Sequence, residues 1–142
     1  MIENKLYSEL FEDFSNCKTK AERINFLRSV RDPKFKIFLK GSFDPRIVFD
    51  VELPEKYRPA PEPAGMTWTT LSGEMDKMYR FVQNHPAKPL GLTKEKETAI
   101  LQVVLESLHK DEARLLVQML QKKLQIPFLK KELVLEAFPG LF

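Results

Sequence analysis

Carboxylates, two histidines and one cysteine are the side chains of this sequence with the potential for catalysis. The acids occur in close pairs that could act as general acid and base if burial separated their pKa values, namely Glu95 and Glu97, Asp111 and Glu112, and Glu132 and Glu136. All of these pairs fall in the first turns or on the polar faces of expected helices, where capping and solubility explain them. We therefore expect no acid–base chemistry from them.

The histidines and the cysteine offer no recognisable catalytic or metal-binding spacing. His85 and His109 are far apart, without a second histidine or a cysteine at ligand spacing, and His109 is expected to cap the end of its own helix. Cys17 is alone, which excludes an internal disulfide and a cysteine-based zinc cluster. The five glycines are too scattered for a dinucleotide turn or a P-loop. The sequence thus predicts no enzyme, no cofactor and no metal ion.

Basic residues interleaved with aromatics are the remaining chemical signal. Between Lys18 and Lys40 there are eight basic residues against two acids, although the net charge of the whole chain is only +3. Such a run can place cations on the phosphates of a polyanion, with aromatic rings available for apolar contact. The alternative is a solvated helix whose Phe35 and Phe38 are simply its buried side. A second basic cluster consists of Lys122, Lys123, Lys130 and Lys131, on both sides of Pro127.

Apolar periodicity predicts the helices that must position these residues. In the first third of the chain, Ile2, Leu6, Leu10 and Phe14 form one amphipathic stripe. Thr19 and Glu22 have capping-box spacing before a helix over 20–31 that buries Ile24, Leu27 and Val30. Asp32 as cap, Pro33 as first residue and Gly41 as end delimit a short third helix.

The second half of the chain predicts four more helical segments. A stripe of Leu71, Met75, Met78 and Val82 follows a cap at Thr69, Thr70 or Ser72, with Phe81 beside it. Thr93 opens a helix to about Leu108, with Ile100, Val103, Val104 and Leu108 inward. Asp111 caps the next, and Pro127 opens the last, with Leu129, Leu133, Val134, Ala137 and Phe138 inward.

Together these elements predict an all-α fold of six or seven helices in a single domain, residues 1–142. A long Pro-rich extended loop at about 54–66 connects its halves, and the segment before it could contain a short strand without an evident partner. No apolar run approaches membrane-spanning length, and the acidic N-terminus is unlike a secretory signal. We expect a cytoplasmic protein.

Four stretches, in this order, resemble the N-terminal DNA-binding domain of tailed-phage ATP-dependent DNA ligases. They are FLRSVRDPKFKIFLKGSF, MTWTTLSGEMDKMYRFV, TAILQVVLESLHKDEARLLVQMLQKKL and the terminal EAFPGLF. The resemblance implies an all-helical domain, encoded by a phage, that grips the duplex backbone across the minor groove around a nick and reads shape rather than sequence. In those ligases a comparable ending leads into the catalytic domain.

Two features of the sequence depart from that family. The adenylation motif Lys-x-Asp-Gly is absent, so no adenylyl transfer is assigned. In the turn LQIPFLKK the bulky Ile126 and Phe128 replace small residues, which would hinder a close phosphate contact.

The leading hypothesis is therefore a stand-alone, non-catalytic phage protein in the cytoplasm of a bacterial host, binding duplex or nicked DNA without sequence preference. The candidate phosphate contacts are Arg28, Arg31, Lys34, Lys36, Lys40, Lys122, Lys123, Lys130 and Lys131. The alternative is a protein-interaction module that modulates phage or host replication or transcription machinery through Tyr57, Leu141 and Phe142. Leu141 and Phe142 either seal the domain or form a free hook.

Overall fold

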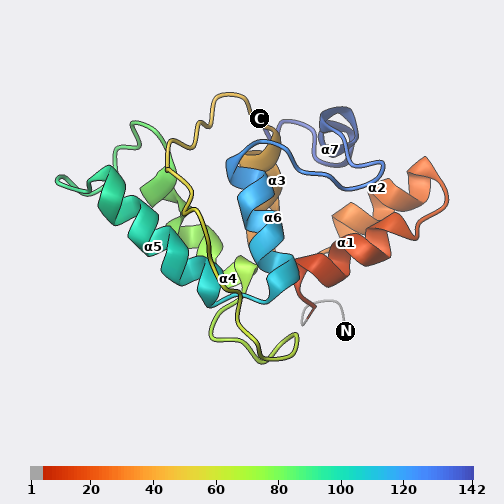
Figure 1. Ribbon diagram of the computed structural model, residues 1–142. Helices are drawn as coiled ribbons and strands as arrows, with labels where there is room; N and C mark the ends of the chain where they lie inside the picture. Colours follow the sequence, from red (N-terminus) through yellow and green to blue (C-terminus); the bar gives the residue numbers. More distant parts are fainter. Residues whose placement is uncertain (1–4) are drawn as a thin grey trace.

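Two helices, α3 (Pro33–Phe43) and α6 (Lys110–Leu120), cross the centre of the protein in the computed structural model, which describes residues 5–142 (Figure 1). On one side of them lie α1 (Tyr7–Ser15), α2 (Lys20–Ser29) and α7 (Lys131–Ala137). On the other side lie α4 (Leu71–Glu74), the 3₁₀ helix η2 (Met75–Phe81) and α5 (Lys94–Glu106). The predicted all-α fold with six or seven helices is confirmed. Ile2, the first residue of the expected N-terminal stripe, lies outside the described residues.

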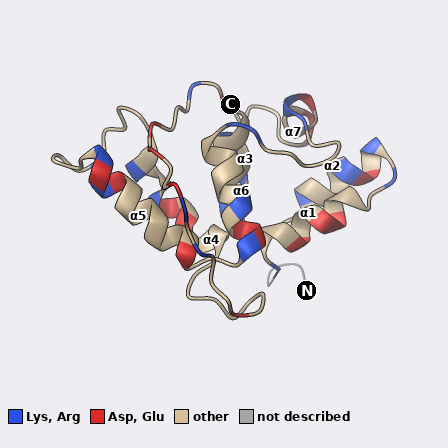
Figure 2. Ribbon diagram, in the orientation of Figure 1, with Lys and Arg blue, Asp and Glu red and all other residues tan. Residues whose placement is uncertain are grey.

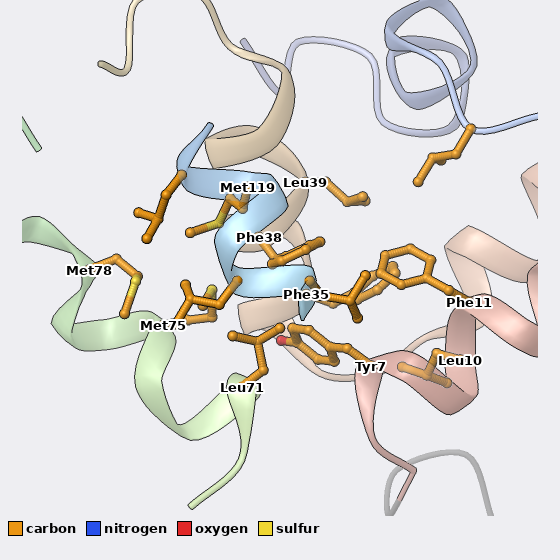
Figure 3. Close-up of a cluster of buried hydrophobic side chains, with 14 of the residues drawn as sticks. Tyr7, Leu10, Phe11, Phe35, Phe38, Leu39, Leu71, Met75, Met78 and Met119 are labelled. Carbon is orange, nitrogen blue, oxygen red and sulfur yellow. The ribbon is translucent and has the colours of Figure 1, made fainter. Parts of the chain in front are cut away.

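The core forms where α1, α4 and η2 meet the central pair (Figure 3). Apolar residues of α3 at positions 35, 38 and 39 are fully buried, as are Leu116 and Met119 of α6. The Tyr7 ring stands edge-on to that of Phe35, with centroids 5.3 Å apart and planes at 81°. Such edge-to-face pairs add about 0.5–1.5 kcal/mol to the stabilisation from burial. No helix of the described part is both long and apolar enough to span a bilayer.

Local capping signals are confirmed where a side chain bonds within its own turn. The Thr19 hydroxyl accepts from the Glu22 amide at 3.1 Å, and the Thr93 hydroxyl accepts from the Lys96 amide at 3.2 Å. The Asp32 carboxylate accepts from the Lys34 amide at 3.0 Å. Thr70 is the cap of α4. The second helix nevertheless ends at Ser29, because Val30 is extended, and only Leu27 of its three expected core residues is fully buried.

The predicted start of the last helix is wrong, as is the expected role of Gly41. Pro127 does not open α7, because Phe128 follows it with φ of 68° and the helix begins at Lys131. Gly41 does not end α3, which continues to Phe43; a Cβ at Gly41 would lie 3.2 Å from Met119 Sδ. Its missing side chain therefore allows α3 and α6 to approach closely.

The cap of α6 is also different from the expected one. His109, and not Asp111, is the N-cap, with its Nδ1 accepting from the Asp111 amide at 3.2 Å. His109 thus belongs to the start of α6 rather than to the end of α5.

Two helical segments in the second half of the chain differ from the prediction. The segment 71–82 is not one α-helix but α4 followed by η2, with Val82 half-buried. In α5 the inward residues are Leu101, Val104 and Leu105, whereas Val103 is 65% exposed. Val103 was expected to be inward, but the core covers a stripe rotated by about half a turn from it.

The Pro-rich loop is extended, as predicted, and runs along α5. The Ala60 amide donates to the Leu108 carbonyl at 3.0 Å, and the Thr98 hydroxyl donates to the Glu52 carbonyl at 2.6 Å. Within the described residues the expected short strand is reduced to an isolated antiparallel bridge between Phe49 and Val82. The loop and the Phe49–Val82 bridge lie on the side of the molecule that carries α5 and η2.

Candidate nucleic-acid interface

The exposed side of α3 carries two of the candidate lysines. Because Phe35, Phe38 and Leu39 face the core, the intervening Lys36 and Lys40, one helical turn apart, face outward. Lys36 is exposed and Lys40 is half-buried. The sequence predicted both residues as phosphate contacts.

Arg28 joins this side of the molecule to α7. Its Nε donates to the Ala137 carbonyl at 2.8 Å, and its terminal nitrogen donates to the Glu136 carbonyl at 2.9 Å. These are carbonyls of the last turn of α7, which lack partners within the helix and form the negative end of its dipole. Arg28 therefore stabilises the α2–α7 contact while its side chain stays at the surface.

Two lysines from distant parts of the chain lie over aromatic rings of the C-terminal segment. Lys36 Nζ is 4.9 Å from the centroid of Phe138, and Lys131 Nζ is 5.9 Å from that of Phe142. Both distances allow cation–π attraction. The first basic run and the second basic cluster thus adjoin around the C-terminal segment, although about 90 residues separate them in the sequence.

The ammonium of Lys122 is bound within the protein and is not free at the surface. It has φ of 59°, and its ammonium donates to the Gly41 carbonyl and, at 2.9 Å, to the Asp44 carbonyl. Burial lowers the pKa of Lys122, with the charge of Asp44 acting in the opposite direction. These bonds hold the chain after α6 against the end of α3 and leave the neighbouring Lys123 exposed.

Lys34 is separated from the other lysines of α3. Its ammonium forms an ion pair with Asp76 of η2 at 3.0 Å, on the side of α3 that faces α4 and η2. Arg31, in the connection between α2 and α3, is exposed. We define the basic surface as the candidates other than Lys34 and Lys122, namely Arg28, Arg31, Lys36, Lys40, Lys123, Lys130 and Lys131. Figure 2 shows basic residues on the side of α2 and α7.

Acidic residues also lie on this side and lower its positive charge. Figure 2 shows acids among the bases of α2 and α7. Glu136 forms an ion pair with Lys20 at 2.7 Å, which leaves Glu132 as the acid of α7 with no ion pair among the described residues. With Glu22 of α2 also exposed, two such acids stand against the seven basic residues, so the basic surface keeps a positive excess.

The turn before α7 contains a contact that the sequence reasoning missed. The guanidinium of Arg23 lies 3.7 Å from the centre of the Phe128 ring, which is 57% exposed. Phe128 therefore fastens the turn to α2 by a cation–π contact instead of standing free. The position of Arg23 in the basic run was the available signal, but sequence spacing does not reveal its partner.

One of the paired acids, Glu112, holds helix ends together. Glu112 is buried, and its two carboxylate oxygens accept from the amides of Tyr7 and Leu71, each at 2.9 Å. These are the first residues of α1 and α4, and Glu112 itself is in the first turn of α6. Burial raises the pKa of Glu112, while the two amide bonds oppose this rise. We define this contact of three helix starts as the N-terminal junction.

The remaining titratable side chains that could take part in catalysis or metal binding have structural contacts. Tyr7 links the N-terminal junction to Asp32, to which its hydroxyl donates at 3.2 Å. Glu97 is buried beside Lys88 at 3.1 Å. His85 Nδ1 accepts from the Ala87 amide at 3.0 Å. Over residues 5–142, no three acids, histidines or cysteines are grouped in a way that could hold a metal ion.

The residues of the alternative partner-binding hypothesis pack inward. Tyr57, Leu141 and Phe142 are each half-buried and lie against the hydrophobic core. The C-terminal pair therefore packs against the domain, which favours the first of the two roles that the sequence left open. Phe138, expected in the core, is half-buried beneath Lys36.

Comparison with known proteins gives one match. The model of a protein family described as "Family of unknown function (DUF6433)" matches residues 10–126. No curated protein and no solved structure matches the chain. The matched span runs from within α1 to the turn that follows α6, and it includes most of the basic surface.

Proposed function

Because the chain belongs to the DUF6433 family, whose description assigns no activity, we propose its function from its own surface: it binds duplex DNA, intact or nicked, through sequence-independent phosphate contacts. In this proposal the protein is encoded by a phage and catalyses no reaction on the DNA. The resemblance to the DNA-binding domain of phage ligases supports the same reading.

One observation carries the proposal. Basic residues of α2 and α3 adjoin basic residues of the segment 123–131, through the contacts of Arg28 with α7 and of Lys36 with Phe138. A polyanion with regularly spaced phosphates gains from such a cluster because each neutralised phosphate releases condensed counterions. Affinity of this kind depends on charge and shape and carries no base preference.

The absence of a catalytic role is supported by what the candidate acids and bases contact. Glu112 binds two helix-start amides, and His109 Nδ1 accepts from a backbone amide. Both side chains therefore have the contacts expected of structural groups. The proposed protein recognises DNA and leaves its covalent bonds unchanged.

The two half-buried C-terminal residues do not favour the alternative function. Leu141 and Phe142 already contact the core, so their apolar surface is used within the chain. We therefore do not propose a partner site at these residues.

A fluorescence anisotropy titration with labelled duplexes tests the proposal. Intact and nicked duplexes of several unrelated sequences should bind with similar affinity, and the affinity should fall steeply as salt rises. Failure to bind any duplex at about 50 mM salt would contradict the proposal. A large preference for one sequence would contradict its phosphate-only mechanism.

A further inference from the structure

The side of the molecule away from the basic surface carries an exposed apolar patch. Trp68 is 88% exposed, and Met66, two residues before it, is 72% exposed. Trp68, Ile100, Val103 and Val104 line a surface recess of about 340 Å³ between the loop, α5 and η2. Large exposed aromatic and aliphatic side chains that lie together commonly mark a site where another molecule binds.

The backbone around Trp68 is fixed although its side chain is exposed. The Thr69 amide donates to the Ser107 carbonyl at 3.3 Å, and the Thr67 hydroxyl donates to the Thr69 carbonyl at 2.8 Å. The Thr69 hydroxyl also donates to the Glu74 carboxylate at 2.8 Å. Trp68 is therefore held at the edge of the recess before anything binds, which lowers the entropy cost of binding.

The charges at the rim of the recess indicate the chemistry of what it binds. Lys77 and Arg80 of η2 are part of its lining, and the Lys77 ammonium, on a side chain that is 57% exposed, lies 3.9 Å from the Glu74 carboxylate. The nearby acid, Glu74, is buried and hydrogen-bonded to Thr69. Two cations against this one acid give the rim a net charge of +1, around a floor of aliphatic side chains.

We propose that this recess docks an acidic segment of a partner protein. Apolar side chains of the partner insert between Trp68 and Val103, and its carboxylates pair with Lys77 and Arg80. Aromatic and arginine anchors with aliphatic surroundings are the usual composition of a protein–protein contact. Duplex DNA fits less well, because its binding depends on many phosphate contacts, and the recess offers only two cations beside aliphatic side chains.

Trp68 makes this proposal directly measurable, since it is the only tryptophan of the chain. A random dodecapeptide display library is first selected on the full-length protein, and enriched peptides are synthesised. They should combine Asp or Glu with Leu, Ile, Phe or Met. Titration with them should move the Trp68 emission to shorter wavelength, because the indole leaves water.

Two variants and one matched control distinguish docking at the recess from non-specific binding. Val103→Glu, at an exposed position, and Lys77→Glu should each weaken binding of the enriched peptides at least tenfold. Lys110→Glu makes the same charge change at the exposed start of α6 and should change the affinity less than twofold. Circular dichroism checks that each variant is folded.

Several results would overturn the proposal. Enriched peptides without acids, or none that shifts the Trp68 emission, would contradict the proposed partner chemistry. Equal binding to wild type and Val103→Glu would show that the recess is not the site. A shift of the Trp68 emission by duplex DNA, abolished by Lys77→Glu, would assign the recess to nucleic acid instead.

Discussion

Lysines of the same sequence run have different roles because of what each contacts. Lys34 and Lys36 are two residues apart, yet the first forms an ion pair with Asp76 and the second lies over Phe138. Lys122 and Lys123 are adjacent, yet the first donates to carbonyls at the end of α3 and the second is exposed. Charge counted along the sequence therefore overstates the number of residues available to a phosphate.

Glu112 is a polar residue on which we expect a large effect on stability. Glu112→Ala leaves the buried amides of Tyr7 and Leu71 without acceptors, at about 1–3 kcal/mol each. We expect the free energy of unfolding to fall by roughly 2–6 kcal/mol, measured by urea denaturation. Glu112→Gln keeps one carbonyl acceptor and should lose less. The exposed Glu132→Ala is the control, and a loss in Glu112→Ala no larger than in this control would contradict the junction's role.

Two aspartates, the buried Asp44 and the half-buried Asp50, predict the response to acid. Burial opposes ionisation of Asp44, but hydrogen bonds and charge from Arg46 outweigh it and lower the pKa of Asp44 below its usual 3.8. Burial likewise opposes ionisation of Asp50, but Lys94 and Lys88 lower its pKa. The unfolded chain therefore binds these protons at higher pH than the folded protein, and their contribution to stability is lost as pH falls below about 4.

Denaturation of Asp44→Asn between about pH 6 and pH 3 measures this contribution. Its stability should fall less on acidification than that of the wild type. Glu112→Gln should have the opposite effect. Because the pKa of Glu112 is raised in the folded protein, protonation of Glu112 favours the folded state, and the stability of this variant should fall more on acidification than that of the wild type. Identical pH profiles for the wild type and both variants would disprove these assignments.

At the scale of elements, the position of α3 against α6 depends on Gly41. A Cβ there would lie 3.2 Å from Met119 Sδ and 3.3 Å from Phe49 Cζ. Gly41→Val should destabilise the protein by about 1–3 kcal/mol through overpacking. Gly41→Ala should cost less, because alanine has the better helix propensity and the Met119 side chain is adaptable.

Ala99→Val is the matched control, since it places the same side chain at an exposed position of α5. Its effect should stay near the difference in helix propensity, below about 0.7 kcal/mol. If Gly41→Val were no more destabilising than Ala99→Val in urea denaturation, the close approach of α3 and α6 would not need the glycine.

The C-terminal segment is a second element whose packing is testable. Deletion of Leu141 and Phe142 removes two half-buried side chains that contact the core. We expect a lower melting temperature and a loss of roughly 1–3 kcal/mol, from half-burial of two large apolar groups. Leu90→Ser, at a fully exposed leucine, is the control. An unchanged melting temperature after the deletion would favour the free hook.

The elements also show what the sequence alone could predict. Caps at Thr19, Asp32 and Thr93 were predictable because each bonds within its own turn. The start of α7 was not, since Phe128 adopts a positive φ and packs on Arg23 of α2. In α5, periodicity gave a helix but not the face covered by the core, so Val103 was misplaced.

The basic surface was only partly predictable for the same reason. Composition identified its residues, but nothing local indicated that Lys36 and Lys131 would adjoin through the C-terminal segment. Lys34 and Lys122 do not belong to the basic surface because an ion pair holds the first and carbonyl contacts hold the second, in both cases with distant segments. Long-range contacts of this kind are fixed by the packing of whole helices.

At the scale of the whole molecule, the two proposed sites lie at opposite ends. The basic surface is on the side of α2 and α7, and the Trp68 recess is on the side of α5 and η2, with the central pair between them (Figure 1). With both sites occupied, one small domain would hold a partner protein beside DNA. Because the net charge is only +3, the position of its cations decides DNA binding more than their total number.

The salt dependence of duplex binding tests the central claim most directly. A triple variant removes Lys36, Lys40 and Lys131 by alanine substitution, and a control triple variant removes the exposed Lys56, Lys96 and Lys110. The account predicts that the slope of log affinity against log salt falls by roughly 2.7 in the first, about 0.9 for each contact, and stays near the wild-type value in the control. Equal losses in both variants, or no binding by the wild type at low salt, would contradict it.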